Sequence, residues 1–252
     1  SDMTMHAADP SAFVKKTAKW YAKYDKIVCV AKSVKERFDE LFDGRFDSTV
    51  LYNVIDDAVI REKALMPLPE GLKKRRLTVL SVGGLLRPKN YMRLLKTHKR
   101  LLAEGITHDL WILGDGPDRP KLERYIEDNG LKNSVYMPGY IDNPYPIIRD
   151  EDILVCSSIY DGYSTFITEG VILGKPIVTT DVSGMRELLG NSEYGLIVDN
   201  DDEAFYVGMK RMLADDQLRQ HYSKAALLRG HDFSADRLAC NTEKYFERLV
   251  YQ

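Results

Sequence analysis

The segment ILVCSSIYDGYSTFITEGVILGKPIVTT, residues 153–180, predicts a strand, a turn, a helix and a second strand in succession. Its two ends, 153–156 and 176–179, are short apolar runs, as expected for strands that are covered on both faces of a sheet. Between them, Ser164 and Thr165 can begin a helix. This order of elements is typical of a parallel α/β sheet.

Similar apolar runs recur along the chain, and amphipathic stretches separate them. Further strands are predicted at 27–30, 49–52, 77–82, 110–113, 135–137 and 196–198. Helices are predicted at 12–22, 33–42, 91–103, 117–129, 205–213, 217–228 and 235–249. Ser33 and Glu36 are interpreted as a capping box that begins one of these helices. The alternation predicts an α/β fold, a Rossmann-like parallel sheet with helices on both faces.

A break rich in proline and glycine, residues 67–71, divides the chain, and four basic residues follow it at 73–76. We therefore predict three parts: residues 1–66, a main sheet domain at 67–232, and a C-terminal helix within 233–252. The basic run is interpreted as a solvated turn before a buried strand, with phosphate binding as the alternative.

Composition excludes several classes of protein. The net charge of −2 over 252 residues argues against a protein that coats nucleic acid, so no nucleic-acid partner is expected. No apolar stretch approaches the ~20 residues of a membrane span, and the polar N-terminus has no signal-peptide core. The three cysteines form no CxxC pair and are interpreted as thiols, and the five histidines show no metal-ligand spacing. We expect a cytoplasmic protein without a metal.

The turns that follow predicted strands are the candidate ligand sites, because ligands bind at the carboxyl ends of parallel strands. After the strand at 77–82 come Gly83, Gly84, Arg87 and Lys89. Glycines let backbone amides approach a ligand, and cations neutralise phosphate oxygens. The alternative is a plain tight loop with surface cations.

Two acidic residues, Asp161 and Glu169, lie in the turn and the helix after the strand at 153–156. They could converge on one polyhydroxylated ligand, although a turn-forming role and a solvated position are the alternatives. The GxG of residues 114–116 lacks the third glycine of a dinucleotide fingerprint and only weakly suggests a nicotinamide cofactor. The turn at 180–187 is interpreted as a helix cap, with ligand contact as the alternative.

Taken in order, these segments resemble the C-terminal, donor-binding half of the retaining glycosyltransferases of family 4, which have the GT-B fold. The most specific match is the pair of acidic residues Asp161 and Glu169, separated by seven residues. The loop at 83–89, the LGDGP of 113–117 and the segment 140–152 with its Asn-Pro-Tyr also match, as do 174–179 and 184–187. Residues 1–66 resemble only the end of the N-terminal, acceptor-binding half and the linker. The resemblance therefore implies a fragment that binds the donor but does not transfer sugar alone.

The resemblance also implies an activity and roles for residues. The family transfers a sugar from a nucleoside diphosphate to an acceptor with retention, and needs neither a metal nor another cofactor. Glu169 is expected to bind the ribose hydroxyls, and Asp161 the hydroxyls of the donor sugar. The backbone amides of Ser164, Thr165 and Phe166 are expected to face the diphosphate, and Gly139 and Tyr140 to border the base. Lys89 is expected to neutralise the leaving diphosphate, so that Asp161 and Lys89 are the expected catalytic residues.

Two departures from the family pattern concern this site. Gly84 stands where the family usually has arginine, and Arg87 is the candidate to replace that charge. Asp161 replaces the usual glutamate and is shorter by one methylene group.

The expected partners are a nucleotide sugar, first of all a UDP-sugar with GDP-sugar open, and a glycan or lipid-linked acceptor of a surface polysaccharide. A lipid-linked acceptor would bring the protein to the inner face of the membrane. Self-association through an exposed sheet edge in residues 1–66 is also expected. The alternatives are a nucleotide-sugar-binding module without catalysis, a GT-B nucleotide-sugar epimerase and a nicotinamide enzyme.

Overall fold

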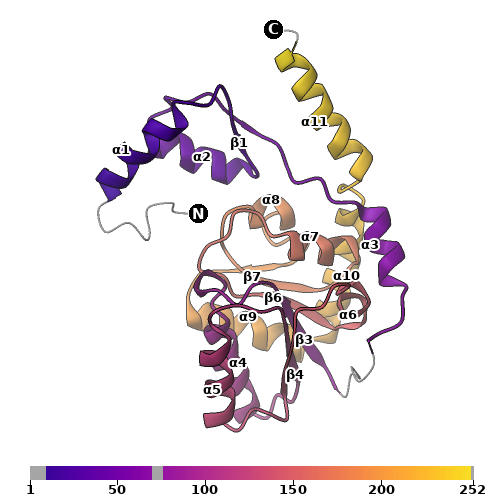
Figure 1. The fold of residues 1–252 in the computed structure, drawn as a ribbon. Coiled ribbons are helices and arrows are strands. Elements are labelled where there is room, and N and C mark those ends of the chain that lie inside the picture. Colours follow the sequence, from indigo (N-terminus) through magenta and orange to yellow (C-terminus); the bar gives the residue numbers. More distant parts are fainter. Residues whose placement is uncertain (1–9, 70–75, 251–252) are drawn as a thin grey trace.

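A parallel sheet of six strands forms the centre of the protein in the computed structural model, which describes residues 10–69 and 76–250 (Figure 1). The strands are β3 (Thr78–Val82), β4 (Asp109–Leu113), β5 (Val135–Gly139), β6 (Ile153–Cys156), β7 (Ile177–Thr180) and β8 (Leu196–Val198). Their spatial order is β5-β4-β3-β6-β7-β8, and every neighbouring pair is parallel. The predicted α/β fold with a parallel sheet is confirmed.

Helices cover both faces of this sheet, because successive strand residues point to opposite sides. Val79 packs with α4 (Tyr91–Ala103), α5 (Arg119–Asp128) and α9 (Asp202–Ala214). Leu80 packs with α6 (Tyr145–Asp150), α7 (Thr165–Ile172) and α8 (Met185–Leu189) on the other face. The longer α10 (Asp216–Gly230) packs against α7 and α9. Two separate apolar layers result, which explains why the strands are apolar throughout rather than alternating.

Residues 10–50 form a smaller unit beside the main sheet. It contains α1 (Pro10–Tyr21), β1 (Ile27–Cys29), α2 (Lys32–Leu41) and β2 (Ser48–Val50), and its two strands pair in parallel. Its core is a cluster of aromatic rings from Tyr21, Phe38, Phe42 and Phe46. Within the described residues β1 pairs only with β2, and Val28 on β1 is exposed. Self-association through this edge stays a prediction.

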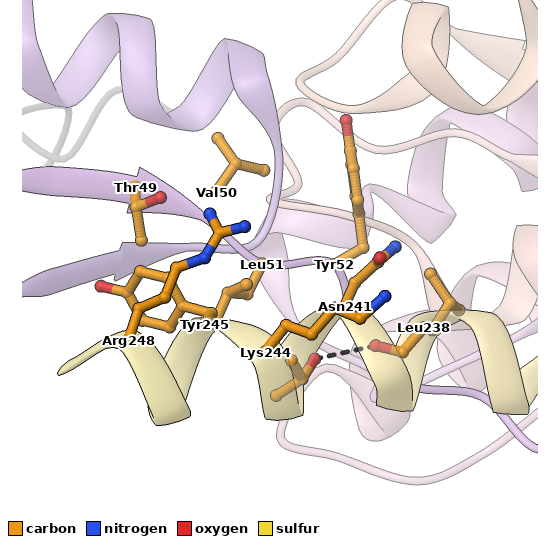
Figure 2. A pocket seen from close by; sticks show the side chains of 10 residues that line it. Thr49, Val50, Leu51, Tyr52, Leu238, Asn241, Lys244, Tyr245 and Arg248 are labelled. Carbon is orange, nitrogen blue, oxygen red and sulfur yellow. Dashed lines mark hydrogen bonds between the residues drawn. The ribbon is translucent and has the colours of Figure 1, made fainter. Parts of the chain in front are cut away.

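Two further helices, α3 (Asp57–Ala64) and α11 (Ala235–Val250), lie next to these parts of the protein. The sequence patterns did not predict α3, which begins where the Asp56 side chain accepts a hydrogen bond from the Val59 amide. Ile60 of α3 is buried in the apolar layer of α6 and α7. The last helix, α11, lies away from the main sheet and beside β2, with a crevice of about 370 Å³ between them (Figures 1 and 2).

Residues 70–75 lie outside the described residues, and with them Gly71 and most of the predicted basic run. Its last member, Arg76, is described and pairs with Asp109 at the start of β4, with Nε 2.7 Å from Oδ1. None of the described helices combines the length and apolar character that crossing a lipid bilayer requires.

The predicted capping box at Ser33 is wrong, because the N-terminus of α2 is capped by a residue distant in sequence. The helix begins at Lys32, and the amides of Lys32 and Ser33 each donate to the Glu187 carboxylate at 2.9 Å. The hydroxyls of Ser33 and Tyr52 also donate to this carboxylate, at 3.1 and 2.9 Å. Ser33 in turn accepts a hydrogen bond from the Gly184 amide. An anion is favourable at a helix N-terminus, where amides lack partners within the helix.

We expect Glu187→Ala to lower the free energy of unfolding by about 2–3 kcal/mol, because it leaves the α2 amides and the Tyr52 hydroxyl without their acceptor. Although burial alone would raise it, the hydrogen bonds from Ser33, Lys32 and Tyr52 hold the pKa of Glu187 below its usual value of 4.5. This stability is therefore present above about pH 4.5 and is lost as the pH falls through the lower folded-state pKa. Urea denaturation of the variant at two pH values measures both effects.

The matched control is Glu193→Ala, which removes an exposed carboxylate from the loop after α8. Equal stability of the two variants at neutral pH would contradict the role of Glu187.

Candidate functional site

The carboxyl edge of the main sheet carries a crevice where the winding of the chain reverses. From β3 the chain proceeds to β4 and β5 on one side, and from β6 to β7 and β8 on the other. The loops after β3 and β6 therefore diverge, which is where open α/β sheets bind ligands. A cavity of about 430 Å³ lies at this edge, between the loops after β3, β4 and β5 and the first turns of α6 and α7. Six of the predicted site residues line it: Gly83, Gly84, Tyr140, Thr165, Phe166 and Glu169.

Close backbone packing explains the glycines of the LGDGP segment. A Cβ atom on Gly114 would lie 2.1 Å from the carbonyl oxygen of Gly83, and one on Gly116 would lie 2.6 Å from that of Leu85. The Leu85 amide also donates to the carbonyl of Asp115 at 2.9 Å. Only glycine permits this approach of the loops after β3 and β4. The GxG pattern is thus explained by the close packing of these two loops.

Glu169 occupies the second turn of α7 and is partly buried at the cavity. Its Oε1 atom accepts a hydrogen bond of 3.2 Å from the hydroxyl of Tyr145. Burial raises the pKa of Glu169 to about 7, although the bond from Tyr145 opposes the rise. Near neutral pH a small change in its surroundings can therefore shift Glu169 between the protonated form and the ionised form, which accepts hydrogen bonds at both oxygens.

The N-terminus of α7 faces the same cavity. Ser164 is its N-cap and accepts a hydrogen bond from the Ile167 amide, while Thr165 and Phe166 line the cavity. The first amides of a helix have no acceptor within the helix, and the helix dipole adds positive potential there. Such a terminus can bind an anion. Ser164 itself is buried and does not line the cavity.

Lys89 and Asp161, the two predicted catalytic residues, form an ion pair with Nζ 2.5 Å from Oδ2. Lys89 ends the short helix η1 (Arg87–Lys89) after β3, and Asp161 lies in the loop after β6, where it also accepts from the Gly162 amide. Two hydrogen bonds join the two loops: the Ile159 amide donates to the carbonyl of Pro88, and the Ser157 hydroxyl donates to the carbonyl of Lys89. The pair therefore spans the point where the winding reverses, next to the cavity rather than in its lining.

The predicted residues of the loops after β3 and β5 occupy different surroundings. Arg87 is exposed, does not line the cavity and forms no hydrogen bond or ion pair with another side chain of residues 10–69 and 76–250. Gly84 has room for a side chain, since a Cβ atom there would come no nearer than 3.5 Å to the Leu86 side chain. Gly139 is buried at the end of β5, where its carbonyl accepts from the Gly114 amide. Tyr140, in contrast, is 76% exposed at the rim.

Sequence reasoning assigned no role to Tyr145, Asp115 or Asp142, which also line the cavity. Tyr145 was noticed only as part of the Asn-Pro-Tyr segment. Its signal is the proline before it, which favours the first turn of a helix and so places the ring at the carboxyl edge.

In the part of the chain that the structure describes, neither a metal cluster nor the crevice between β2 and α11 indicates a different functional site. Within the described residues no group of three or more His, Cys, Asp or Glu side chains could hold a metal ion. The crevice between β2 and α11 is lined by Lys244, Tyr245 and Arg248 among others, and it contains none of the predicted site residues (Figure 2).

A family model described as glycosyl transferases group 1 matches residues 66–229. The chain belongs to this glycosyltransferase family. Its main sheet is one Rossmann-like half of a GT-B fold, and the cavity lies at the carboxyl edge of that half.

Individual proteins support this assignment. A Campylobacter jejuni enzyme, N-acetylgalactosamine-N,N'-diacetylbacillosaminyl-diphospho-undecaprenol 4-alpha-N-acetylgalactosaminyltransferase, is 34% identical over 198 residues, which are 78% of this chain and 52% of the enzyme. Sucrose-phosphate synthase from Thermosynechococcus elongatus has a TM-score of 0.82 at 17% identity, covering 99% of this chain and 64% of that one. Anabaena HepE, solved with UDP and glucose, has a TM-score of 0.78 at 13% identity, covering 95% and 68%. The glycosyltransferase chain spans about half the length of the curated relatives it matches.

We expect Glu169→Gln to stabilise the protein by about 2 kcal/mol near pH 8 and to leave its stability nearly unchanged near pH 4.5. Burial raises the folded-state pKa of Glu169 to about 7, so the native state resists ionisation. The contribution of Glu169 to stability is fully present below its unfolded-state pKa of 4.5, and it is lost as the pH rises through the folded-state pKa of about 7. Thermal unfolding of both proteins across this range measures the difference.

Glu243→Gln, an exposed change on α11, is the control and should show no such pH dependence. If Glu169→Gln were equally stable or less stable than the unmodified chain at pH 8, the burial of this carboxylate would be refuted.

Proposed function

We propose that this chain binds a nucleoside diphosphate sugar, with a UDP-sugar as first choice, as the donor-binding part of a retaining glycosyltransferase of family 4. The observation that carries the proposal is Glu169, partly buried at the cavity and about one turn from the amides at the start of α7. A carboxylate acceptor beside an anion-binding helix terminus suits a ribose joined to phosphates.

The nucleoside end of the donor fits the cavity better than the phosphates do. The lining contains the acidic side chains of Asp115, Asp142 and Glu169, and no lysine or arginine of the described residues. These acids would accept hydrogen bonds from sugar hydroxyls and base amino or imino groups but would repel phosphate. We infer that the base lies toward the loop after β5, where Gly139 and Tyr140 border it.

The diphosphate would then lie at the start of α7, within reach of Lys89. Cleavage of the glycosyl–phosphate bond builds negative charge on the departing diphosphate. The amides of Thr165 and Phe166 and the Lys89 ammonium would stabilise this charge, and Asp161 would accept hydrogen bonds from the donor sugar. For these roles the Lys89–Asp161 ion pair must open, so that the donor takes the place of each partner.

The acceptor and the stereochemistry of transfer are inferred from the relative. The name of the Campylobacter enzyme specifies a diphospho-undecaprenol acceptor and an α-linked product. We infer a lipid-linked or glycan acceptor for the complete protein, with residues outside this chain forming most of its site. Transfer from an α-linked nucleotide sugar to an α-linked product retains the configuration of the sugar.

We expect UDP to bind the chain near pH 8, and Glu169→Ala to weaken binding by about 30- to 100-fold, since two hydrogen bonds to a charged acceptor are lost. Titration calorimetry with UDP, GDP and NAD measures the affinities. Glu193→Ala serves as the control and should bind like the unmodified chain.

The nucleotides that bind distinguish the proposed function from its alternatives. Binding of GDP in preference to UDP would change the base and keep the ribose assignment. An undiminished affinity of Glu169→Ala would remove that assignment, and selective binding of NAD would favour a nicotinamide enzyme.

For the complete protein we expect transfer of the sugar with its anomeric configuration retained, which NMR analysis of the product measures through the anomeric coupling. An inverted product would contradict membership of a retaining family. Formation of an epimer of the nucleotide sugar would instead indicate an epimerase.

A nucleotide-sugar-binding module without catalysis is the second candidate. One observation favours it: the exposed Arg87 does not reach the cavity that Gly84 lines, so a positive charge expected from the family is missing there. Donor binding by the complete protein without any transfer or epimerisation would support this reading.

A further inference from the structure

The hydroxyl of Tyr145 contacts the carboxylate that we assign to the ribose. Tyr145 is the first residue of α6, whereas Glu169 lies in α7, and both side chains line the cavity. The phenol donates to Oε1 of Glu169 at 3.2 Å. Burial and the nearby charge of Glu169 raise the pKa of Tyr145 to about 12, so the phenol keeps the proton that it donates.

The position of Tyr145 is fixed from outside the cavity. The Asn143 side chain accepts a hydrogen bond from the Tyr145 amide at 3.3 Å and donates to the carbonyl of Lys63 on α3 at 3.2 Å. At the other end of α6, Arg149 donates to the carbonyl of Ala64. Both ends of the short helix are therefore attached to α3, which fixes the backbone position from which the Tyr145 side chain extends.

One carboxylate oxygen of Glu169 is thus already engaged before a ligand arrives. A carboxylate has about four lone-pair sites on two oxygens. The bond from Tyr145 fixes the plane of the carboxylate and leaves Oε2, with one site on Oε1, for new donors. Two adjacent hydroxyls, as on a ribose, can donate to these free sites together, whereas a single hydroxyl uses only one.

The hydrogen bond from Tyr145 also affects the ionisation of Glu169. Burial raises the pKa of the carboxyl group, and the bond from Tyr145 is the influence that lowers it. The helices packed against α7 are α3, α6 and α10, and among their described residues only Tyr145 of α6 contributes to this pKa. The other acidic groups that line the cavity are Asp115 and Asp142.

We propose that Tyr145 is a positioning residue, which holds the Glu169 carboxylate in the orientation that receives a vicinal diol of the nucleoside. The proposal rests on the proposed function, since the diol is that of the donor ribose. Tyr145 acts through Glu169 and needs no contact with the ligand itself.

The test compares the unmodified chain with Tyr145→Phe in calorimetric titrations with UDP and with 2′-deoxy-UDP, between about pH 5.5 and 8.5. We expect Tyr145→Phe to bind UDP about tenfold more weakly near neutral pH, because the Glu169 carboxyl group is then less often ionised and no longer held in one orientation. The pH at which UDP affinity reaches half of its maximum should rise. The preference for UDP over 2′-deoxy-UDP should shrink, because a carboxylate that can turn no longer receives both hydroxyls.

Tyr136→Phe is the matched control. It removes the same kind of hydroxyl from a ring that packs against Trp111; this hydroxyl donates to the Asn133 carbonyl, away from the cavity. This variant should keep the affinity, the pH midpoint and the preference of the unmodified chain.

A second measurement needs no ligand. The titration of the Glu169 carboxyl group, followed by carbon-13 NMR of the free protein, should move to higher pH in Tyr145→Phe. An unchanged titration, or an unchanged pH midpoint and nucleotide preference, overturns the positioning role. If the titration moves but the unmodified chain binds neither UDP nor GDP, the link between Tyr145 and Glu169 stands, while the proposed function is wrong and the assignment to a ribose falls with it.

Discussion

The reversal of winding at β3 and β6 is the constraint on which the site depends. All strands of the main sheet are parallel, so every strand ends at the same edge, and neighbouring loops normally cover one another there. Among the described strands, only β3 and β6 are neighbours whose following loops leave in opposite directions. The ion pair of Lys89 and Asp161 bridges this opening, and the cavity lies beside it. The topology of the sheet thus determines where the site lies, and the side chains at the strand ends determine which ligand it can bind.

Glu187 extends the influence of this edge to the smaller unit. Its carboxylate accepts hydrogen bonds from two amides of α2 and from two hydroxyls. It therefore caps the N-terminus of a helix that begins about 155 residues earlier in the chain. The same contact region reaches the loop that carries Asp161: the ring of Tyr163 lies 5.7 Å from that of Tyr52, and a Cβ on Gly162 would touch Val30. The orientation of residues 10–50 and the shape of the loop after β6 are therefore coupled.

Much of this could be predicted from local sequence, and the remainder required contacts between distant residues. The apolar runs predicted the strands, because burial on both faces leaves a local signature. Spacing placed Glu169 on a helix that begins at the sheet edge. Nothing near Ser33 in sequence could reveal that Glu187 replaces it as the cap, and nothing near Lys89 indicated Asp161 as its partner. The glycines at 114 and 116 are likewise explained only by the loop that packs on them.

The attachment of α3 to the wall of the cavity affects how the protein can be divided. Residues 57–64 precede the main sheet in sequence, yet Ile60 is buried in its apolar layer and the carbonyls of Lys63 and Ala64 hold both ends of α6. A shortened protein that begins after the proline-rich break would expose this layer to water and release the ends of α6. A version intended for nucleotide-binding work should therefore begin ahead of Asp56, whose side chain starts α3.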